Sequence, residues 1–442
     1  MSVPSPIEKA AIIATGDEVV GGRTVDTNSA FIADRLASVG IETVCVLVVG
    51  DYPERIEWAW HQAIGQADVV ISTGGLGPTA DDLTTETVAR VAGVELVLDE
   101  QQAERIRGFF ARVGRPMPEN NLRQAMIPAG AEVIENRLGT APGYRLWIPS
   151  RERACLAVVL PGVPREMKAM MDEQVLPWLA ASCGSGRVVL SRTFQTFGMS
   201  ESAVDEALAG VVDPSEGRLA FRASFPQIAV RVTVADRDEQ AARRRLQILG
   251  DRVAERLGHA VIAEGETTME EVVGELLRRA GKTLATAESC TGGLIGNRIT
   301  NVAGSSDYYV GGVVAYSNQL KQDLLGVSRS TLAMFGAVSE ETACEMALGV
   351  RRATGADIGL ATTGIAGPGG GTAEKPVGTV AVALAAETAG EDTVRSKTYR
   401  LWGNREWVKT LASQVALDWV RRHLLGLDPL EATFGRRTRS VQ

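Results

Sequence analysis

Residues 283–300, which read TLATAESCTGGLIGNRIT, decide the fold of the C-terminal part of the chain. Their pattern predicts a buried strand, a tight glycine-containing turn and a helix. In a sheet of parallel strands such a turn lies at the carboxyl edge, where ligands bind. Ser289 is therefore a candidate nucleophile, and amides at the start of the helix could stabilise an oxyanion. The alternative is that Ser289 or Thr291 serves only as a helix N-cap.

A lysine follows the next predicted strand. Residues 311–321 read GGVVAYSNQLK, so Lys321 comes closely behind an apolar strand and Tyr316. A lysine acts as a base only where burial or a nearby cation lowers its pKa from about 10.4. The position of Lys321 makes it a candidate general base, and a solvent-exposed helix lysine is the alternative.

A third segment, residues 362–372, reads TTGIAGPGGGT. Glycines at this density are typical of a loop whose amides hold an anion or lie against a ligand. The segment is not a Walker loop, because no GK[ST] follows at the required spacing. A flexible surface loop is the alternative interpretation.

The N-terminal part alternates strand and helix in the order β-α-β-α-β, which predicts a parallel sheet with helices on both faces. The loops after the strands ending at Ala14 and Ser72 should meet at one edge. Residues 73–82 read TGGLGPTADD, and their glycines would let phosphates approach a helix N-terminus. The candidate phosphate-binding residues are Thr15, Gly16, Asn28, Gly74, Gly75, Gly77 and Thr79.

Two adjacent carboxylates end this segment. Asp81 and Asp82 would offer hard oxygen ligands to a divalent metal ion. Alternatively, they merely cap the following helix and complement its dipole.

From residue 188 the predicted order changes to β-α-β-β-α. The segments are residues 188–196, 201–211, 219–223, 227–235 and 239–257. This order resembles a KH-type fold, but no GxxG loop with basic neighbours is present, which favours a spacer or dimerisation module over RNA binding. We therefore expect domains at residues 1–172, 173–264 and 265–425, and a polar, basic, disordered tail at residues 426–442.

Bulk composition excludes several classes of protein. A formal net charge of −8 argues against a general nucleic-acid binder. Residues 1–9 contain no apolar h-region, so we expect no secretory signal, and no apolar run is long enough to predict a membrane-spanning helix. Five scattered cysteines without CxxC spacing favour a reducing cytoplasm. The three histidines lie outside the motifs, so we expect catalysis without a histidine base.

Taken together, ESCTGG, YSNQLK and TGIAGPGGG resemble, in order and spacing, the C-terminal domain of the CinA family over essentially all of residues 268–425. The resemblance implies deamidation of nicotinamide mononucleotide to nicotinate mononucleotide and ammonia, without a cofactor. It makes Ser289 the nucleophile and Lys321 the base; Cys290 is a rival nucleophile, disfavoured because no histidine is placed to form a thiolate. The implied substrate-binding residues are Cys290, Thr291, Gly292, Gly293, Ser306, Tyr316, Thr363, Gly364 and Arg405, with Arg400 as an alternative to the last.

The N-terminal motifs, with Asn120, Asn121 and residues 139–143 and 160–168, resemble the molybdopterin-binding-like domain of full-length CinA proteins. This resemblance implies metal-dependent hydrolysis of ADP-ribose to AMP and ribose 5-phosphate. Related folds adenylylate molybdopterin instead, so the fold alone does not choose. The predicted fold class is α/β, with a three-layer molybdopterin-binding-like domain, a small α+β KH-like middle domain and a C-terminal α/β amidohydrolase domain.

The resulting hypothesis is a bifunctional cytoplasmic enzyme that recycles pyridine nucleotides. Its expected partners are the two small nucleotides and a second copy of the chain, without nucleic acid or membrane. One alternative is a molybdopterin-pathway adenylyltransferase. The other is a non-enzymatic competence or DNA-repair accessory, against which the net charge of −8 speaks.

Overall fold

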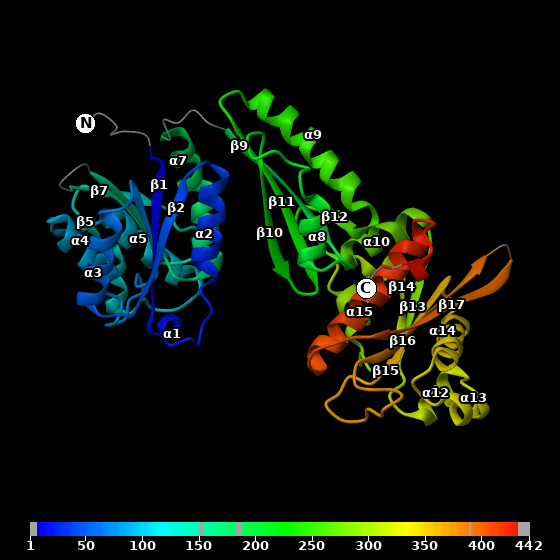
Figure 1. Cartoon of the computed structure of the whole chain (residues 1–442). Coiled ribbons are helices and arrows are strands. Elements are labelled where there is room, and N and C mark those ends of the chain that lie inside the picture. The colour runs from blue at the N-terminus through cyan, green and yellow to red at the C-terminus, as the bar shows by residue number, and fades with distance from the viewer. Residues whose placement is uncertain (1–6, 150–153, 183–187, 389, 432–442) are drawn as a thin grey trace. The chain divides into compact units, whose positions relative to one another are not determined.

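The computed structural model describes residues 7–149, 154–182, 188–388 and 390–431, which Figure 1 colours along the chain. The chain divides into two compact units. One consists of Met1–Ser191 with Val234–Arg245, and the other of Arg192–Thr233 with Leu246–Gln442.

The N-terminal domain contains a six-stranded mixed sheet in the order β2-β1-β3-β8-β7-β6. Its strands are β1 (Lys9–Thr15), β2 (Glu42–Val49), β3 (Val69–Thr73), β6 (Glu132–Ile134), β7 (Gly143–Ile148) and β8 (Cys155–Leu160). The pairs among β2, β1, β3 and β8 are parallel, as predicted for the first three strands, whereas β7 and β6 pair antiparallel. Strands β3 and β8 are buried along their whole length, which explains their continuous apolar sequences.

Helices cover both faces of this sheet. Ile32 and Leu36 of α2 (Thr27–Ser38) pack with α6 (Pro164–Met170) on one face. Trp60 of α3 (Pro53–Ile64) and Val88 of α4 (Thr84–Ala92) pack on the other. The predicted three-layer arrangement is therefore present. The remaining elements are α1 (Asp17–Val20), β4 (Leu96–Leu98), α5 (Glu100–Arg112), β5 (Met126–Pro128) and α7 (Leu176–Ser182).

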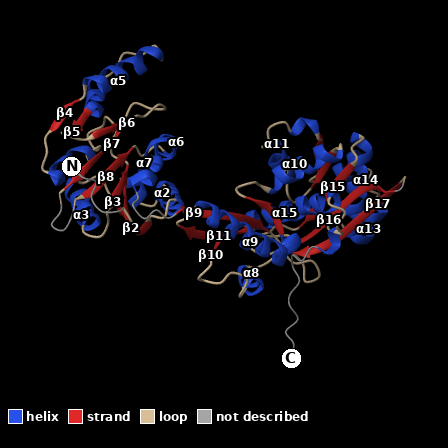
Figure 2. Cartoon of the chain, turned by 90° about the horizontal axis from the view of Figure 1, so that it is seen from above, coloured by secondary structure: helices blue, strands red, loops and turns tan. Residues whose placement is uncertain are grey.

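The middle domain is a small α+β module, seen from a second direction in Figure 2. It contains β9 (Val188–Thr196), α8 (Glu201–Leu208), β10 (Arg218–Ser224), β11 (Gln227–Asp236), α9 (Glu239–Leu257) and β12 (Val261–Glu264). The sheet order is β10-β11-β9-β12. The predicted β-α-β-β-α order is confirmed, and β12 is an additional strand that pairs antiparallel with β9.

The C-terminal domain has a five-stranded sheet in the order β14-β13-β15-β16-β17. The strands are β13 (Leu284–Glu288), β14 (Tyr309–Val314), β15 (Ile358–Gly364), β16 (Thr379–Thr388) and β17 (Glu391–Arg400). The first three strands in the order are parallel, and the last two pair antiparallel.

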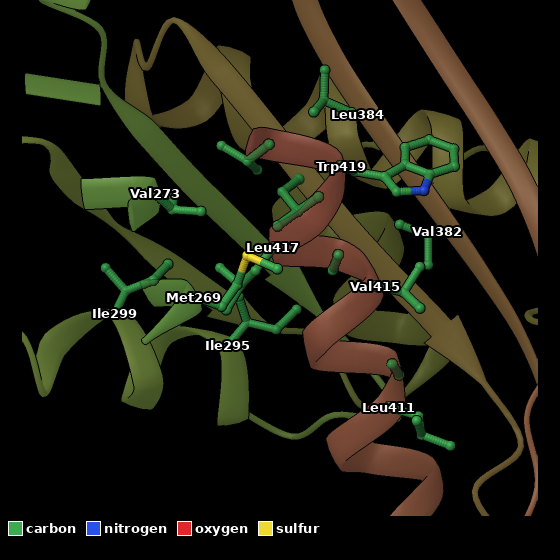
Figure 3. Close-up of a cluster of buried hydrophobic side chains, with 14 of the residues drawn as sticks. Met269, Val273, Ile295, Ile299, Val382, Leu384, Leu411, Val415, Leu417 and Trp419 are labelled. Atoms are coloured by element: carbon green, nitrogen blue, oxygen red, sulfur yellow. The ribbon is translucent and has the colours of Figure 1, made fainter. Parts of the chain in front are cut away.

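Helices lie on both faces of this sheet too. On one face are α10 (Met269–Ala280), α11 (Leu294–Thr300) and α15 (Arg405–Leu424); on the other are α12 (Asn318–Leu325), α13 (Arg329–Phe335) and α14 (Glu340–Thr354). Figure 3 shows Val415 and Trp419 of α15 in one cluster with Val382 and Leu384 of β16. Alanines of the same strand face α14 instead. Their small size lets α14 lie close to the sheet.

Two predictions drawn from the composition, on membrane spans and on cysteines, can be compared with the described residues. No helix in the described ranges is long and apolar enough to cross a membrane. Four described cysteines, Cys45, Cys155, Cys290 and Cys344, are free thiols, and Cys183 lies outside the described residues.

The predicted disordered tail begins too early. Residues 426–431 are described and include a short 3-10 turn, Pro429–Glu431. Lys397 donates to the carbonyl of Leu430 at 3.0 Å, and Leu430 packs against the C-terminal core. The prediction was therefore wrong for these residues, because apolar Leu430 ties them down. Residues 432–442 lie outside the described range.

Candidate active site

The first candidate site lies where three strands of the C-terminal sheet end. Ser289 follows β13 directly, and its amide donates at 2.9 Å to the carbonyl of Thr362, near the end of β15. On the other side, the amide of Ala315, just after β14, donates at 2.9 Å to the carbonyl of Glu288. Because β14, β13 and β15 are parallel, their carboxyl ends share one edge. The predicted position of Ser289 at this edge is confirmed.

Lys321 reaches this edge from α12. Its Nζ lies 3.0 Å from Oγ of Ser289 and donates to the carbonyl of Ala315 at 2.8 Å. Lys321 is 1% exposed and Ser289 is 8% exposed. The alternative of a solvent-exposed helix lysine is therefore wrong, and the structure brings the two candidate catalytic residues together.

Burial shifts the pKa values of Lys321 and Cys290, which both lie near Ser289, in opposite directions. It lowers the pKa of Lys321, which favours the neutral amine, and the nearby Cys290 thiol opposes this shift. It also raises the pKa of Cys290 to about 12, which keeps that thiol protonated near neutral pH. A neutral amine beside a hydroxyl is the arrangement that activates a serine nucleophile. The site therefore favours Ser289 over Cys290.

Glu288 was not identified from the sequence, although it lies beside Ser289. It is 2% exposed, and its carboxylate accepts from the amides of Gly293, Ile295 and Gly296 at 3.0, 3.1 and 2.8 Å. Three such bonds satisfy a buried carboxylate and hold the start of α11 against the end of β13. Glu288 is therefore the cap of α11, the role that the N-cap alternative assigned to Ser289 or Thr291.

This cap narrows the choice of oxyanion donors. Gly293 donates to the Glu288 carboxylate, and Gly292 donates to the carbonyl of Ser289 at 3.1 Å. Among the described hydrogen bonds, the amides of Cys290 and Thr291 have no backbone acceptor. Of the four amides between Ser289 and α11, those of Cys290 and Thr291 therefore remain. The N–H groups of these two amides are the donors left for a developing oxyanion.

Arg405 and Tyr316 meet beside the glycine-rich loop. The guanidinium of Arg405 donates to the carbonyl of Gly367 at 2.7 Å and to Oη of Tyr316 at 2.9 Å. Arg400 donates instead to the carbonyl of Glu374 at 3.0 Å. The structure therefore places Arg405, and not Arg400, next to Tyr316 and the loop.

Two threonine hydroxyls are occupied inside the protein. Oγ1 of Thr291 lies 2.8 Å from Oγ1 of Thr362, and Thr363 donates to the carbonyl of Ala337 at 2.6 Å. At the end of β15, a Cβ on Gly364 would meet the carbonyl of Thr379. These residues hold the loops of the site together. Their contact with a substrate stays a prediction.

Ser306 lies apart from the others. It belongs to the 3-10 turn Ser305–Asp307, which precedes β14, whereas Ser289 lies at the carboxyl end of the parallel neighbour β13. The six residues of β14 separate the two ends by roughly 17–20 Å. The structure therefore does not bring Ser306 to the Ser289 site within this chain. The motif order could not reveal this, because it does not show which end of a strand each serine occupies.

The sequence analysis missed a second cation, Lys409, which lies near the loop of residues 289–293, called here the nucleophile loop. Gly292 and Gly293 adopt φ angles of 63° and 91°, in the left-handed region that favours glycine. A Cβ on Gly292 would lie 3.8 Å from Nζ of Lys409. Lys409 follows Arg405 by four residues in α15, so both lie on one side of that helix. This spacing was the available signal.

The second candidate site is a cavity of about 620 Å³ in the N-terminal domain. The loops after β1 and β3 form it, and a Cβ on Gly74 would collide with the carbonyl of Thr15, so the two loops meet as predicted. The predicted residues among its lining are Thr15, Gly16, Asn28, Gly74, Gly75, Gly77, Asp81 and Asp82. Thr79 does not line the cavity; its amide donates to the carboxylate of Asp82 at 2.8 Å.

Buried polar atoms in this cavity lack partners. Oγ1 of Thr15 and Oδ1 of Asn28 are without a hydrogen-bond partner, although the two residues are only 6% and 8% exposed. The amide nitrogen of Asn28 is held by Oγ1 of Thr73 at 3.1 Å and by the carbonyl of Gly162 at 2.8 Å. Unpaired buried polar atoms are costly, so they indicate a polar ligand.

The charge of the cavity bears on the predicted metal. Its described lining contains no lysine, arginine or histidine. It contains the carboxylates of Glu18, Asp26, Asp51, Asp81, Asp82 and Glu166. The described residues hold no group of three side chains placed to bind a metal ion. One or two of these carboxylates could still share a cation such as Mg²⁺ with phosphates of a ligand, and the metal-binding role of Asp81 and Asp82 stays a prediction.

Asp51 is the carboxylate most affected by this crowding. Burial raises its pKa, an effect that its hydrogen bond from the amide of Asp17 opposes. The carboxylates of Asp17, Glu18 and Asp81 raise it further. Asp82 is less available to a metal ion, because its carboxylate already accepts hydrogen bonds from the amide and the hydroxyl of Thr79.

Three family models match successive parts of the chain. A probable molybdopterin binding domain matches residues 11–181. A damage-inducible protein CinA KH domain matches residues 191–263, and a CinA C-terminal domain matches residues 266–424. The predicted α/β fold with these three kinds of domain is confirmed.

Relatives match over nearly the whole chain. A CinA-like protein of Geotalea uraniireducens is 43% identical over 426 residues, which cover 96% of this chain and 100% of that protein. A CinA-like protein of Desulfosudis oleivorans is 45% identical over 419 residues, which cover 94% of this chain and 100% of that protein. The resemblance drawn from the sequence motifs is therefore confirmed.

The Lys321→Met variant should lose a pH dependence of stability. Because burial lowers the pKa of Lys321 in the folded state, the unfolded chain binds more protons between that pKa and about 10.4. The free energy of unfolding of the wild type should therefore rise with pH through this window. Below the window, where Lys321 is protonated in both states, the full cost of burying its charge lowers the stability. Urea unfolding of wild type and Lys321→Met measures the difference at each pH. The exposed Lys9→Met is the control, and a difference that does not change with pH contradicts the assignment.

Proposed function

The chain belongs to the CinA family, and on this premise we propose that its C-terminal domain deamidates nicotinamide mononucleotide to nicotinate mononucleotide and ammonia. The observation that carries this proposal is the buried pair of Lys321 and Ser289, with 3.0 Å between Nζ and Oγ. The pair needs no cofactor, because the amine itself can take the serine proton. The wider chain is a CinA-family protein with a molybdopterin-binding-like domain.

The reaction follows from the protonation states. Neutral Lys321 accepts the hydroxyl proton of Ser289 as Oγ attacks the carboxamide carbon. The tetrahedral intermediate collapses when the protonated amine gives that proton to the departing nitrogen, which leaves as ammonia. Water, activated by the same amine, then hydrolyses the acyl-serine ester and leaves a carboxylate on the product. Ser289 regains its proton, so the cycle consumes one water.

The groups around Ser289 suit the negative charge that develops on the substrate oxygen in this reaction. The amides of Cys290 and Thr291 are available to the oxyanion, and each donor of this kind is worth about 3–4 kcal/mol in the transition state. The carboxylate of Glu288 is engaged by three amides of α11, so its charge is compensated there. Lys321 has no carboxylate partner in the described contacts that would hold it protonated.

The cations of α15 suit the nucleotide phosphate. Arg405 is fixed by Gly367 and Tyr316, and Nζ of Lys409 approaches Gly292 of the nucleophile loop. Arginine and lysine both bind phosphate through charge-assisted hydrogen bonds. We infer that the phosphate lies between these two side chains, which would direct the nicotinamide carboxamide toward Ser289.

Ser289→Ala should abolish ammonia release from nicotinamide mononucleotide, by at least about 10³-fold in kcat, because the nucleophile is removed. Cys290→Ala should stay within about 10-fold of the wild type, since the Cys290 thiol is protonated near neutral pH. Ammonia is measured in a coupled assay. Loss of activity in Cys290→Ala alone would assign the nucleophile to Cys290, and an inactive wild type would reject the deamidase function.

Lys409→Gln tests the phosphate site. With a phosphate partner gone, KM for the mononucleotide should rise about 10-fold, the effect of losing a charge-assisted hydrogen bond of roughly 1.5 kcal/mol or more. Nicotinamide riboside lacks the phosphate, so its turnover should be the same in this variant as in the wild type. Equal losses with both substrates would place Lys409 outside the phosphate site.

For the N-terminal domain we propose hydrolysis of ADP-ribose to AMP and ribose 5-phosphate with a divalent metal ion. The favouring observation is the acidic cavity of about 620 Å³ with unpaired Thr15 and Asn28 oxygens. Because its described lining lacks cationic side chains, a diphosphate needs a metal ion there to offset its charge. Asp51 and Asp81 both line this cavity, and we propose that they share that ion.

Replacing both Asp81 and Asp82 by Ala should remove metal-dependent cleavage of ADP-ribose and leave ammonia release unchanged. AMP formation is followed with and without EDTA. Because Asp82 also holds the turn at Thr79, Asp81→Asn with Asp82 intact separates a metal role from a turn role. Cleavage that persists in the double variant assigns both carboxylates to capping, and formation of adenylylated pterin from ATP would favour the adenylyltransferase alternative.

A further inference from the structure

An aromatic contact joins the middle domain to the C-terminal domain within the second compact unit. Phe225 occupies the two-residue turn between β10 and β11, next to the closing pair of Ser224 and Gln227. Its ring stacks on that of Trp407 with 4.4 Å between centroids and 26° between planes. Both residues remain 43% exposed. Two large aromatic groups at a hairpin tip and on a helix surface thus meet outside either core.

Trp407 is fixed from its other side by the start of α15. Its amide donates to the side chain of Asn404 at 2.9 Å, which caps the helix. Gly403 has a φ of 97°, and a Cβ there would come within 2.7 Å of Cβ of Trp407. The indole therefore lies between the Phe225 ring and the backbone that enters α15. The Trp407 side chain therefore links the Phe225 ring to the backbone of this first turn.

The same turn carries Arg405. Its guanidinium donates to the Gly367 carbonyl and to Oη of Tyr316, at the rim of the Ser289 site. A continuous series of contacts therefore runs from Phe225 through Trp407 and the first turn of α15 to a residue that the proposed function assigns to the nucleotide phosphate. Nothing in the deamidation chemistry explains why a hairpin of another domain should reach this turn.

We propose that Phe225 is a positioning residue for the deamidase site: through Trp407 it fixes the first turn of α15 and thereby the direction of Arg405. This inference rests on the proposed deamidation. The middle domain then contributes to substrate binding, although none of its residues needs to touch the substrate. The effect belongs to binding and not to the chemical step, because Ser289 and Lys321 lie on other elements.

Phe225→Ala should raise KM for nicotinamide mononucleotide about 3- to 10-fold, the range expected for loss of one aromatic pair, with kcat within about 2-fold of the wild type. Phe225→Tyr, which keeps the stacked ring, should restore KM. The matched control is Ile248→Ala, which removes a 52% exposed apolar side chain from α9. A wild type without activity would reject the deamidase proposal itself, and the variants are compared only with an active wild type.

The decisive measurement combines two substitutions. If Phe225 acts through Arg405, then Phe225→Ala should add little to the rise in KM in an Arg405→Ala background, whereas independent effects would multiply. Thermal unfolding of each variant shows whether the fold is retained. The proposal is overturned if Phe225→Ala leaves KM unchanged, if it lowers kcat in place of raising KM, or if its effect is undiminished without Arg405.

Discussion

The C-terminal site depends on the amine of Lys321, which is buried beside the Ser289 hydroxyl and has no carboxylate partner among the described contacts. Removing an ammonium group from water is strongly unfavourable, so the buried amine of Lys321 is held toward its neutral form. That burial is a property of the packing around α12. A Cβ on Gly349 of α14 would collide with the carbonyl of Leu325, so α12 can lie this close to α14 only with glycine there. The base strength of the site thus depends on a helix–helix contact that lies outside it.

The neighbouring carboxylate shows the complementary constraint. Glu288 is nearly as buried as Lys321, and an ion pair between the two would hold the amine protonated and unable to accept a proton. Three amides of α11 instead surround the Glu288 carboxylate. The chain therefore keeps two buried ionisable groups near the same nucleophile and satisfies them separately. This separation also decides which amides remain for the oxyanion, since α11 has none of its first-turn donors to spare for Ser289.

Local patterns predicted much of the fold but little of the contact geometry. The strand at Val188–Thr196 and the helix at Glu239–Leu257 have the bounds read from the sequence, because apolar spacing and turn residues act over a few positions. The antiparallel β6 and β7 were not predicted, since strand direction depends on partners far along the chain. In the site, Ser289 and Lys321 were found because both follow neighbouring strands. Lys409 was missed because its approach depends on how α15 packs across the sheet.

The two candidate sites carry side chains of opposite charge, so the proposed nucleotide phosphates would be bound there in different ways. At the Ser289 site α15 carries two cations, Arg405, which is held by Gly367 and Tyr316, and Lys409, so the proposed mononucleotide would need no metal ion there. The described lining of the N-terminal cavity provides only carboxylates as charged groups, which repel a diphosphate until a divalent ion intervenes. Under the proposed functions, a chain with a net charge of −8 would bind its two anionic nucleotides by different means. Chelation of free metal ions would then suppress binding at the N-terminal cavity alone, so metal availability would be a physical basis for setting the two proposed activities independently.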